Sequence, residues 1–202
     1  MHIKAKKSLG QNFLIDREVL EKIVSTIDIT NKEILEIGPG SGNLTSYILK
    51  KNPKKVFVIE KDDELALMLK EKFVDQIEII NDDVLKISED KISHKKLIVF
   101  GNLPYNISTE ILSKWIINIG KTFWFENLIL MFQKEVADKI LAQHKSSSFG
   151  RLTVLANSRL KVTDFFNISK NCFYPVPKVK STVLVFEPIV NEDFRVKDIS
   201  NL

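Results

Sequence analysis

Cysteine and histidine are scarce in this sequence. Cys172 is the only cysteine among 202 residues, which excludes an intrachain disulfide framework and makes a reducing compartment, the cytoplasm, the natural expectation. The three histidines, His2, His94 and His144, are scattered along the chain, so no metal-ligand spacing exists. We therefore expect neither a structural nor a catalytic metal.

Long apolar runs are also missing. None approaches the roughly 20 residues that a membrane-spanning helix requires. The N-terminal residues Lys4, Lys6 and Lys7 have no apolar stretch behind them, so the sequence predicts neither a signal peptide nor a membrane anchor. The net charge is only +4, which suits an anionic partner such as a nucleic acid but does not identify one.

What is present is an alternation of helical and strand patterns. An amphipathic helix is expected after Asp16, which is placed as its N-cap, and five short apolar runs then predict buried strands separated by helices. This pattern is typical of an α/β protein with a doubly wound, mostly parallel sheet. The strands are expected at 34–37, 56–59, 77–80, 97–100 and 128–132, and the helices between them at 44–49, 65–73 and 111–119.

The last part of the chain predicts further strands. A polar, serine-rich loop is expected at 144–150, followed by strands at 152–162 and 182–186. Pro188 is expected to close a core of residues 1–188. The polar segment 189–202 is too short to fold alone and is interpreted as a linker.

A glycine-rich turn leaves the first predicted strand. Its glycines, at 38, 40 and 42, depart from the spacing of a dinucleotide fingerprint, which disfavours a pyrophosphate cradle. Glu60 ends the second strand, where its carboxylate can accept both hydroxyl protons of a ribose. Asp83, or Asp82 beside it, follows the third strand and can accept from an adenine amine. We therefore expect a nucleoside cofactor without phosphate, the alternatives being a tight turn, a surface glutamate and an ordinary Asx turn.

A second motif, Asn102-Leu103-Pro104-Tyr105, follows the fourth predicted strand. The lone pair of an adenine N6 amine is delocalised, and the Asn102 side-chain oxygen and the Leu103 carbonyl can accept its two hydrogens to favour an attacking geometry. Pro104 restricts the backbone of the residue before it, and Tyr105 can stack on an unstacked base. The motif predicts methyl transfer to an adenine amine; a strand-ending turn with a half-buried tyrosine is the alternative.

Together these motifs resemble the ribosomal RNA adenine dimethyltransferases, specifically the KsgA type that acts on small-subunit RNA. The resemblance covers nearly all of residues 4–188 and rests on segments 7–14, 36–45, 102–109, 132–135, 150–152 and 173–179. It implies a Rossmann-like, class I methyltransferase fold with a seven-stranded sheet and S-adenosylmethionine as cofactor. The implied reaction is dimethylation of N6 on two adjacent adenosines near the 3′ end of 16S ribosomal RNA during ribosome maturation.

The resemblance also assigns residues to sites. It implies that Phe173 is the second face of an aromatic clamp around the target adenine, opposite Tyr105, although a phenylalanine beside a proline-rich turn is usually a core residue. The resemblance implies that segment 189–202 leads toward a helical C-terminal domain, which we expect to be absent from this chain. The implied cofactor contacts are Asn12, Leu14, Gly38, Gly40, Glu60, Asp83 and Asn102.

Basic residues are candidates for contacts to RNA phosphates, with an ordinary solvated surface as the alternative. The expected partner is small-subunit ribosomal RNA or the pre-30S particle, bound by a monomer. The candidate residues are Lys4, Lys6, Lys7, Lys145, Arg151, Lys178 and Lys180.

Three other functions remain open at this point. The first is the related large-subunit ribosomal RNA adenine methyltransferase that confers macrolide resistance, which shares nearly every motif. The second is a non-catalytic RNA-binding or assembly factor on the same fold, against which the intact Asn102 and Tyr105 argue. The third is a small-molecule methyltransferase, which the basic N-terminal segment makes less attractive.

Overall fold

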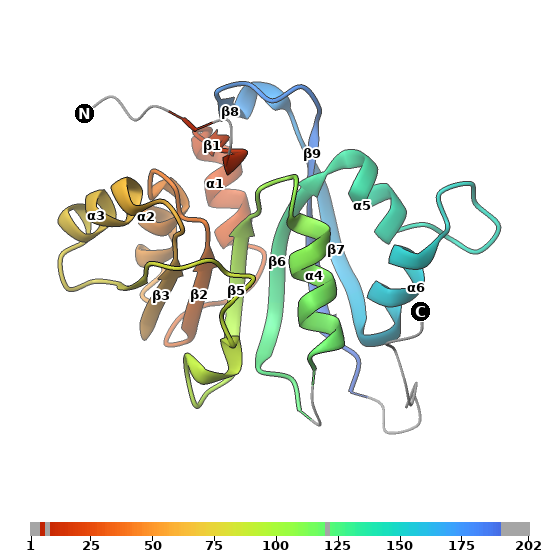
Figure 1. The fold of residues 1–202 in the computed structure, drawn as a ribbon, viewed down its shortest axis with the longest axis horizontal. Helices are drawn as coiled ribbons and strands as arrows, with labels where there is room; N and C mark the ends of the chain where they lie inside the picture. Colours follow the sequence, from red (N-terminus) through yellow and green to blue (C-terminus); the bar gives the residue numbers. More distant parts are fainter. Residues whose placement is uncertain (1–4, 7–8, 120–121, 191–202) are drawn as a thin grey trace.

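A computed structural model describes residues 5–6, 9–119 and 122–190 (Figure 1). Within these residues, seven strands form one sheet in the order β4-β3-β2-β5-β6-β9-β7, in which β9 is antiparallel to both of its neighbours and the other pairs are parallel. The strands are β2 (Glu33–Ile37), β3 (Lys55–Ile59), β4 (Glu78–Ile80), β5 (Leu97–Asn102), β6 (Phe125–Gln133), β7 (Leu160–Ile168) and β9 (Ser181–Pro188).

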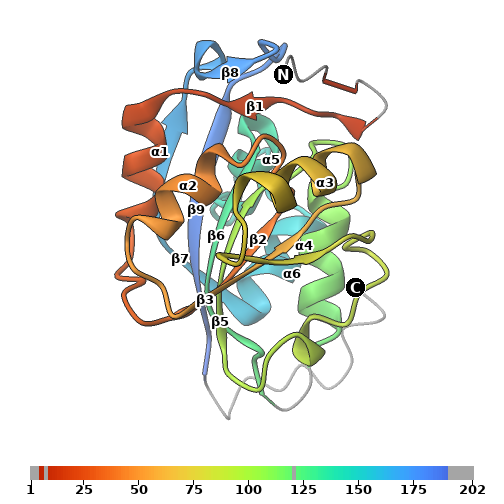
Figure 2. The ribbon, with the colours of Figure 1, turned by 90° about the vertical axis from the view of Figure 1, so that its left-hand side faces the viewer.

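Helices cover both faces of the sheet (Figure 2). Successive residues of a strand point to opposite faces, so Ile34 of β2 packs in one apolar cluster and Leu35 in the other. This two-sided burial explains why the central strands are continuous apolar runs in the sequence. One face carries α1 (Arg17–Val24) and α2 (Asn43–Leu49), the other carries α4 (Ser108–Ile117), α5 (Lys134–Ile140) and α6 (Arg151–Arg159), and α3 (Asp63–Lys72) lies beside β4.

A second, very small sheet joins the beginning of the chain to its later part. Strand β1 (Phe13–Leu14) pairs antiparallel with β8 (Phe173–Tyr174), and both lie at the same end of the molecule in Figure 2. Two single-turn helices, η2 (Glu89–Lys91) and η3 (Lys170–Cys172), complete the described elements. None of the helices in the described ranges is long and apolar enough to cross a membrane.

Most of the expected elements are confirmed. Asp16 is the N-cap of α1, and its side chain accepts from the Val19 backbone N–H. The expected strand at 152–162 is wrong, because α6 occupies 151–159 and β7 begins at Leu160. Leu152, Leu155 and Ala156 have the i, i+3, i+4 spacing of one helix face, and they pack against the core. Helix α5 was not anticipated, and residues 191–202 of the expected linker lie outside the described residues.

Helix α3 offers a matched test of the packing. Leu69 is 0% exposed, whereas Leu67 on the same helix is 61% exposed. We predict that Leu69→Ala lowers the free energy of unfolding by about 2–5 kcal/mol, because it removes buried methyl groups and leaves a cavity. Leu67→Ala is expected to change it by less than about 0.5 kcal/mol. Urea unfolding measures both, and equal effects would contradict this placement of α3.

Candidate active site

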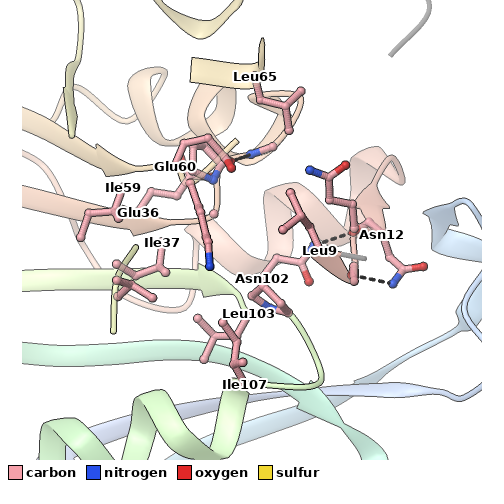
Figure 3. Close-up of a pocket in the computed structure, with 18 of the residues that line it drawn as sticks. Leu9, Asn12, Glu36, Ile37, Ile59, Glu60, Leu65, Asn102, Leu103 and Ile107 are labelled. Carbon is pink, nitrogen blue, oxygen red and sulfur yellow. Dashed lines mark hydrogen bonds between the residues drawn. The ribbon is translucent and has the colours of Figure 1, made fainter. Parts of the chain in front are cut away.

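A cavity of about 190 Å³ opens at the carboxyl ends of β2, β3, β4 and β5 (Figure 3). The strand order changes direction at this point, because β3 lies on one side of β2 and β5 lies on the other. Open parallel sheets bind their ligands at such a switch point. The cavity brings together nearly all of the predicted cofactor and catalytic residues: Asn12, Leu14, Gly38, Gly40, Glu60, Asp83, Asn102, Leu103, Pro104 and Tyr105.

The glycine turn after β2 forms the floor of the cavity. Gly38 and Gly40 have φ values of 64° and 56°, a region that side-chain-bearing residues rarely adopt. A Cβ atom on Gly40 would lie 2.8 Å from the Phe13 ring, so only glycine lets the N-terminal segment pack this closely on the turn.

Glu60 is buried beside this turn, and both of its carboxylate oxygens accept a backbone hydrogen bond. Oε2 accepts from the Gly40 N–H at 3.1 Å and Oε1 from the Asp62 N–H at 2.9 Å. Burial raises the pKa of the Glu60 carboxyl above its ordinary value. Each carboxylate oxygen has a second acceptor position, so Glu60 is oriented to receive two ribose hydroxyls.

The cavity wall is acidic. Glu60, Asp82 and Asp83 line it together with Glu36, whose buried carboxyl has a pKa raised to about 8, and within the described chain Lys61 is the only basic residue that does so. The Lys61 ammonium lies 2.7 Å from Asp83 Oδ2, and this hydrogen bond holds the pKa of Asp83 below its usual range. Such a wall repels a pyrophosphate and suits a ligand with cationic centres. S-adenosylmethionine, with its sulfonium and ammonium groups and no phosphate, fits these residues.

The N-terminal segment is fastened over the cavity by Asp62, the N-cap of α3. Its two oxygens accept from the Lys6 ammonium and from Gln11 Nε2, each at 2.8 Å, and Lys6 also lies 3.2 Å from Glu64. Sequence reasoning missed Gln11 and Asp62 because no local pattern links two residues that lie far apart in the chain. Lys6 takes part in this network, and its predicted contact with an RNA phosphate stays a prediction.

A half-buried lysine supports the loop that carries Asp83. The Lys114 ammonium, on α4, donates to the Val84 carbonyl at 2.6 Å, to the Ile87 carbonyl at 2.5 Å and to Glu89 Oε1 at 2.7 Å. The Trp115 indole N–H donates to the same Glu89 oxygen at 2.6 Å. Because α4 directly follows the predicted catalytic turn, this network ties the adenine side of the cavity to the catalytic side.

In the catalytic turn, Asn102 Nδ2 donates to the Asn12 backbone carbonyl at 2.9 Å. A carbonyl oxygen can only accept, so this bond fixes the amide orientation and leaves the Asn102 Oδ1 atom as the acceptor. The Leu103 side chain is buried against Gly101, where a Cβ atom would lie 2.7 Å from Leu103 Cδ2. The Tyr105 hydroxyl shares a 2.5 Å hydrogen bond with the Ser181 hydroxyl, which restrains the ring.

Phe173 does not lie where the resemblance implied. Its side chain is 1% exposed and packs in the apolar cluster that also holds Leu14, and it is absent from the cavity lining. Phe173 therefore lies outside the cavity in this structure, and the clamp with Tyr105 that the resemblance implies stays a prediction. The reason is the register of β8: Phe173 lies opposite Leu14 and shares its core-facing side.

The remaining basic candidates lie on the surface. Lys145, Arg151, Lys178 and Lys180 are exposed. Lys4 and Lys7 lie outside the described residues, so their predicted RNA contacts stay predictions.

Comparison with known proteins agrees with this geometry. A family model described as ribosomal RNA adenine dimethylase matches residues 2–202. The chain belongs to the ribosomal RNA adenine dimethylase family. Members of this family are S-adenosylmethionine-dependent methyltransferases, so the cofactor is S-adenosylmethionine and the substrate is ribosomal RNA.

Two curated relatives in the ribosomal RNA adenine dimethylase family are similar along almost the whole chain. The ribosomal RNA small subunit methyltransferase A of Pelagibacter ubique is 65% identical over 202 residues, which are 100% of this chain and 77% of the relative. The protein of the same name from Mesomycoplasma hyopneumoniae is 43% identical over 197 residues, or 97% of this chain and 73% of the relative.

Two solved structures share the architecture of this ribosomal RNA adenine dimethylase family member. A dimethyladenosine transferase from Plasmodium falciparum has a TM-score of 0.76 and 31% identity, covering 87% of this chain and 63% of that one. The 23S rRNA methyltransferase ErmE has a TM-score of 0.75 and 27% identity, covering 89% of this chain and 70% of that one. The expected Rossmann-like methyltransferase fold is confirmed.

The raised pKa of Glu36 predicts how the stability of the protein depends on pH. It is buried beneath the glycine turn, where it accepts a 2.6 Å hydrogen bond from the Thr45 hydroxyl, and burial raises its pKa from 4.5 to about 8. Because the folded state favours the neutral carboxyl, the stability from this group is fully present below its ordinary pKa and is lost as the pH rises through its folded pKa.

We predict that the cofactor-free protein loses on the order of 3 kcal/mol of unfolding free energy through Glu36 between about pH 5 and about pH 9. Glu36→Gln keeps a polar partner for Thr45 but never ionises, so this part of the decline should disappear. Urea unfolding of both proteins across this range measures the difference. Parallel curves would show that Glu36 does not titrate in this window.

Proposed function

We propose that this protein transfers methyl groups to N6 of two adjacent adenosines near the 3′ end of 16S ribosomal RNA, giving N6-dimethyladenosines as the subunit matures in the cytoplasm. The observation that carries the chemistry is the hydrogen bond from Asn102 to the Asn12 carbonyl, which presents the Asn102 oxygen as an acceptor at the cavity. The names of the curated relatives support the small subunit as the target.

Asn102 and the Leu103 backbone prepare the amine to react. Oxygen acceptors on both N6 hydrogens concentrate the nitrogen lone pair, which is otherwise spread into the ring. Pro104 disfavours helical backbone at Leu103 and so restrains the second acceptor, the Leu103 carbonyl. When bound, S-adenosylmethionine supplies an electrophilic methyl group on a sulfonium.

Tyr105 offers its ring to the target base. Its hydroxyl is tied to Ser181, so the ring is held in one orientation, and stacking offsets part of the cost of taking a base out of its RNA stack. No strong base is required, because the methylated amine is acidic and can lose its proton to solvent. The acidic groups of the wall therefore serve binding rather than proton transfer.

The central test is substitution of Asn102. We predict that Asn102→Ala lowers kcat by at least about 10²–10³-fold, because it removes a positioned acceptor, while S-adenosylmethionine binding persists in weakened form. Asn102→Asp should also lose activity, because a carboxylate cannot donate to the Asn12 carbonyl. Asn118→Ala, at an exposed asparagine after α4, is the control. Activity of Asn102→Ala equal to that of the parent would remove Asn102 from catalysis.

The target RNA separates this function from that of the large-subunit methyltransferases, to which the fold is equally similar. We predict that labelled S-adenosylmethionine transfers label to undermethylated small ribosomal subunits and not to large ones. Mass analysis of the nucleosides should give N6-dimethyladenosine. Label entering only the large subunit would support the macrolide-resistance function, and no label in either would favour a binding factor.

A further inference from the structure

Strand β8 presents its two aromatic residues to opposite sides. Residues directly opposite each other in an antiparallel pair share a face, so Phe173 shares the face of Leu14, and Tyr174 shares the face of Phe13. Leu14 and Phe173 belong to the core. Phe13 and Leu14 both line the cavity, but Phe13 lies outside that core cluster and packs on Gly40, so Tyr174 stands on the side of β1 and β8 that faces the glycine turn.

Tyr174 itself remains outside the cavity. Its side chain is 61% exposed, and its hydroxyl forms no hydrogen bond with any residue in the described ranges. No ring of the described chain stacks on it. Nothing in the fold therefore requires a large aromatic side chain at this position, and its ring faces are open to a ligand.

The surroundings of Tyr174 suit single-stranded RNA. Exposed Val176 and Val179 follow it, and Lys178 and Lys180 are exposed with no ion pair to a described residue. Aromatic rings interleaved with unpaired lysines are the combination that binds single strands, since the rings stack bases and the ammonium groups pair with phosphates.

The position of Tyr174 relative to the catalytic turn determines which base of a bound RNA strand can contact its ring. Asn102 bonds to Asn12, Asn12 precedes Phe13, and Phe13 lies opposite Tyr174. The backbone of Tyr174 is therefore on the order of 10 Å from the Asn102 amide. A base inside the cavity would meet Tyr105, whereas a neighbour along the same strand that stays outside can reach Tyr174.

We propose that Tyr174 is a stacking platform for a nucleotide that flanks the target adenosine. This inference rests on the proposed function, and it gives the RNA an aromatic surface outside the cavity. The two aromatic surfaces hold different bases: Tyr105 faces the reacting base, and Tyr174 faces its neighbour. Tyr174 thus contributes to RNA affinity and not to the methyl-transfer step.

The experiment compares Tyr174→Ala, Tyr174→Phe and the parent on undermethylated small subunits. Loss of one stacked base should raise the KM for the subunit roughly 5- to 150-fold in Tyr174→Ala, with kcat and S-adenosylmethionine affinity unchanged. Tyr174→Phe keeps the ring and should retain the parent KM. Phe165→Ala, at an exposed aromatic residue on β7, is the matched control and should also retain it.

The salt dependence of RNA affinity distinguishes base stacking on Tyr174 from charge pairing with phosphates. Tyr174→Ala should leave the slope of log affinity against log salt unchanged, whereas Lys178→Ala should reduce it by about 1 if that lysine contacts a phosphate. An unchanged KM in Tyr174→Ala, a Tyr174→Phe variant as weak as Tyr174→Ala, or a fall in Tm or cofactor affinity would each overturn the stacking assignment. Those results leave the proposed function intact if the parent methylates small subunits. A parent that does not methylate them overturns both.

Discussion

The hydrogen bond between the Asn102 side chain and the Asn12 carbonyl is the contact on which the site depends. It orients the amide, so that an oxygen rather than an N–H group is presented to a substrate amine. It also joins the end of β5 to the N-terminal segment that closes the cofactor cavity. The acceptor that we propose for catalysis is therefore oriented by that segment, whose position over the cavity Asp62 supports through Lys6 and Gln11.

The parts of the site that follow strand ends could be predicted from the sequence. Parallel strands bring their carboxyl ends to one edge of a sheet, so the glycine turn, Glu60, Asp83 and Asn102 are found together once the strands are recognised. The contacts that secure them could not be predicted. Gln11 and Asp62 are 51 residues apart, and Lys114 and Glu89 are 25 apart, and no periodicity in the sequence relates such pairs.

One wrong prediction and one that stays open have physical explanations of different kinds. In α6 the β-branched residues suggested a strand, but the i, i+3, i+4 spacing of the residues that reach the core determined a helix. At Phe173 the family resemblance and the general preference of phenylalanine for the core pointed in opposite directions. The two-residue pairing of β1 with β8 decided between them, because a single-residue change of register would exchange the faces of Phe173 and Tyr174.

The pairing of β1 with β8 also constrains the order in which the elements can fold during synthesis of the chain. A chain leaves the ribosome with its N-terminus first, and Phe13 must wait for Tyr174, 161 residues later, before its strand has a partner. Until then the nascent protein can assemble the sheet from β2 to β6, and the N-terminal segment is held only by its contacts with Asp62 and Asn102. The small sheet that joins the N-terminal segment to the later part of the fold therefore forms only after residue 174 has been synthesised.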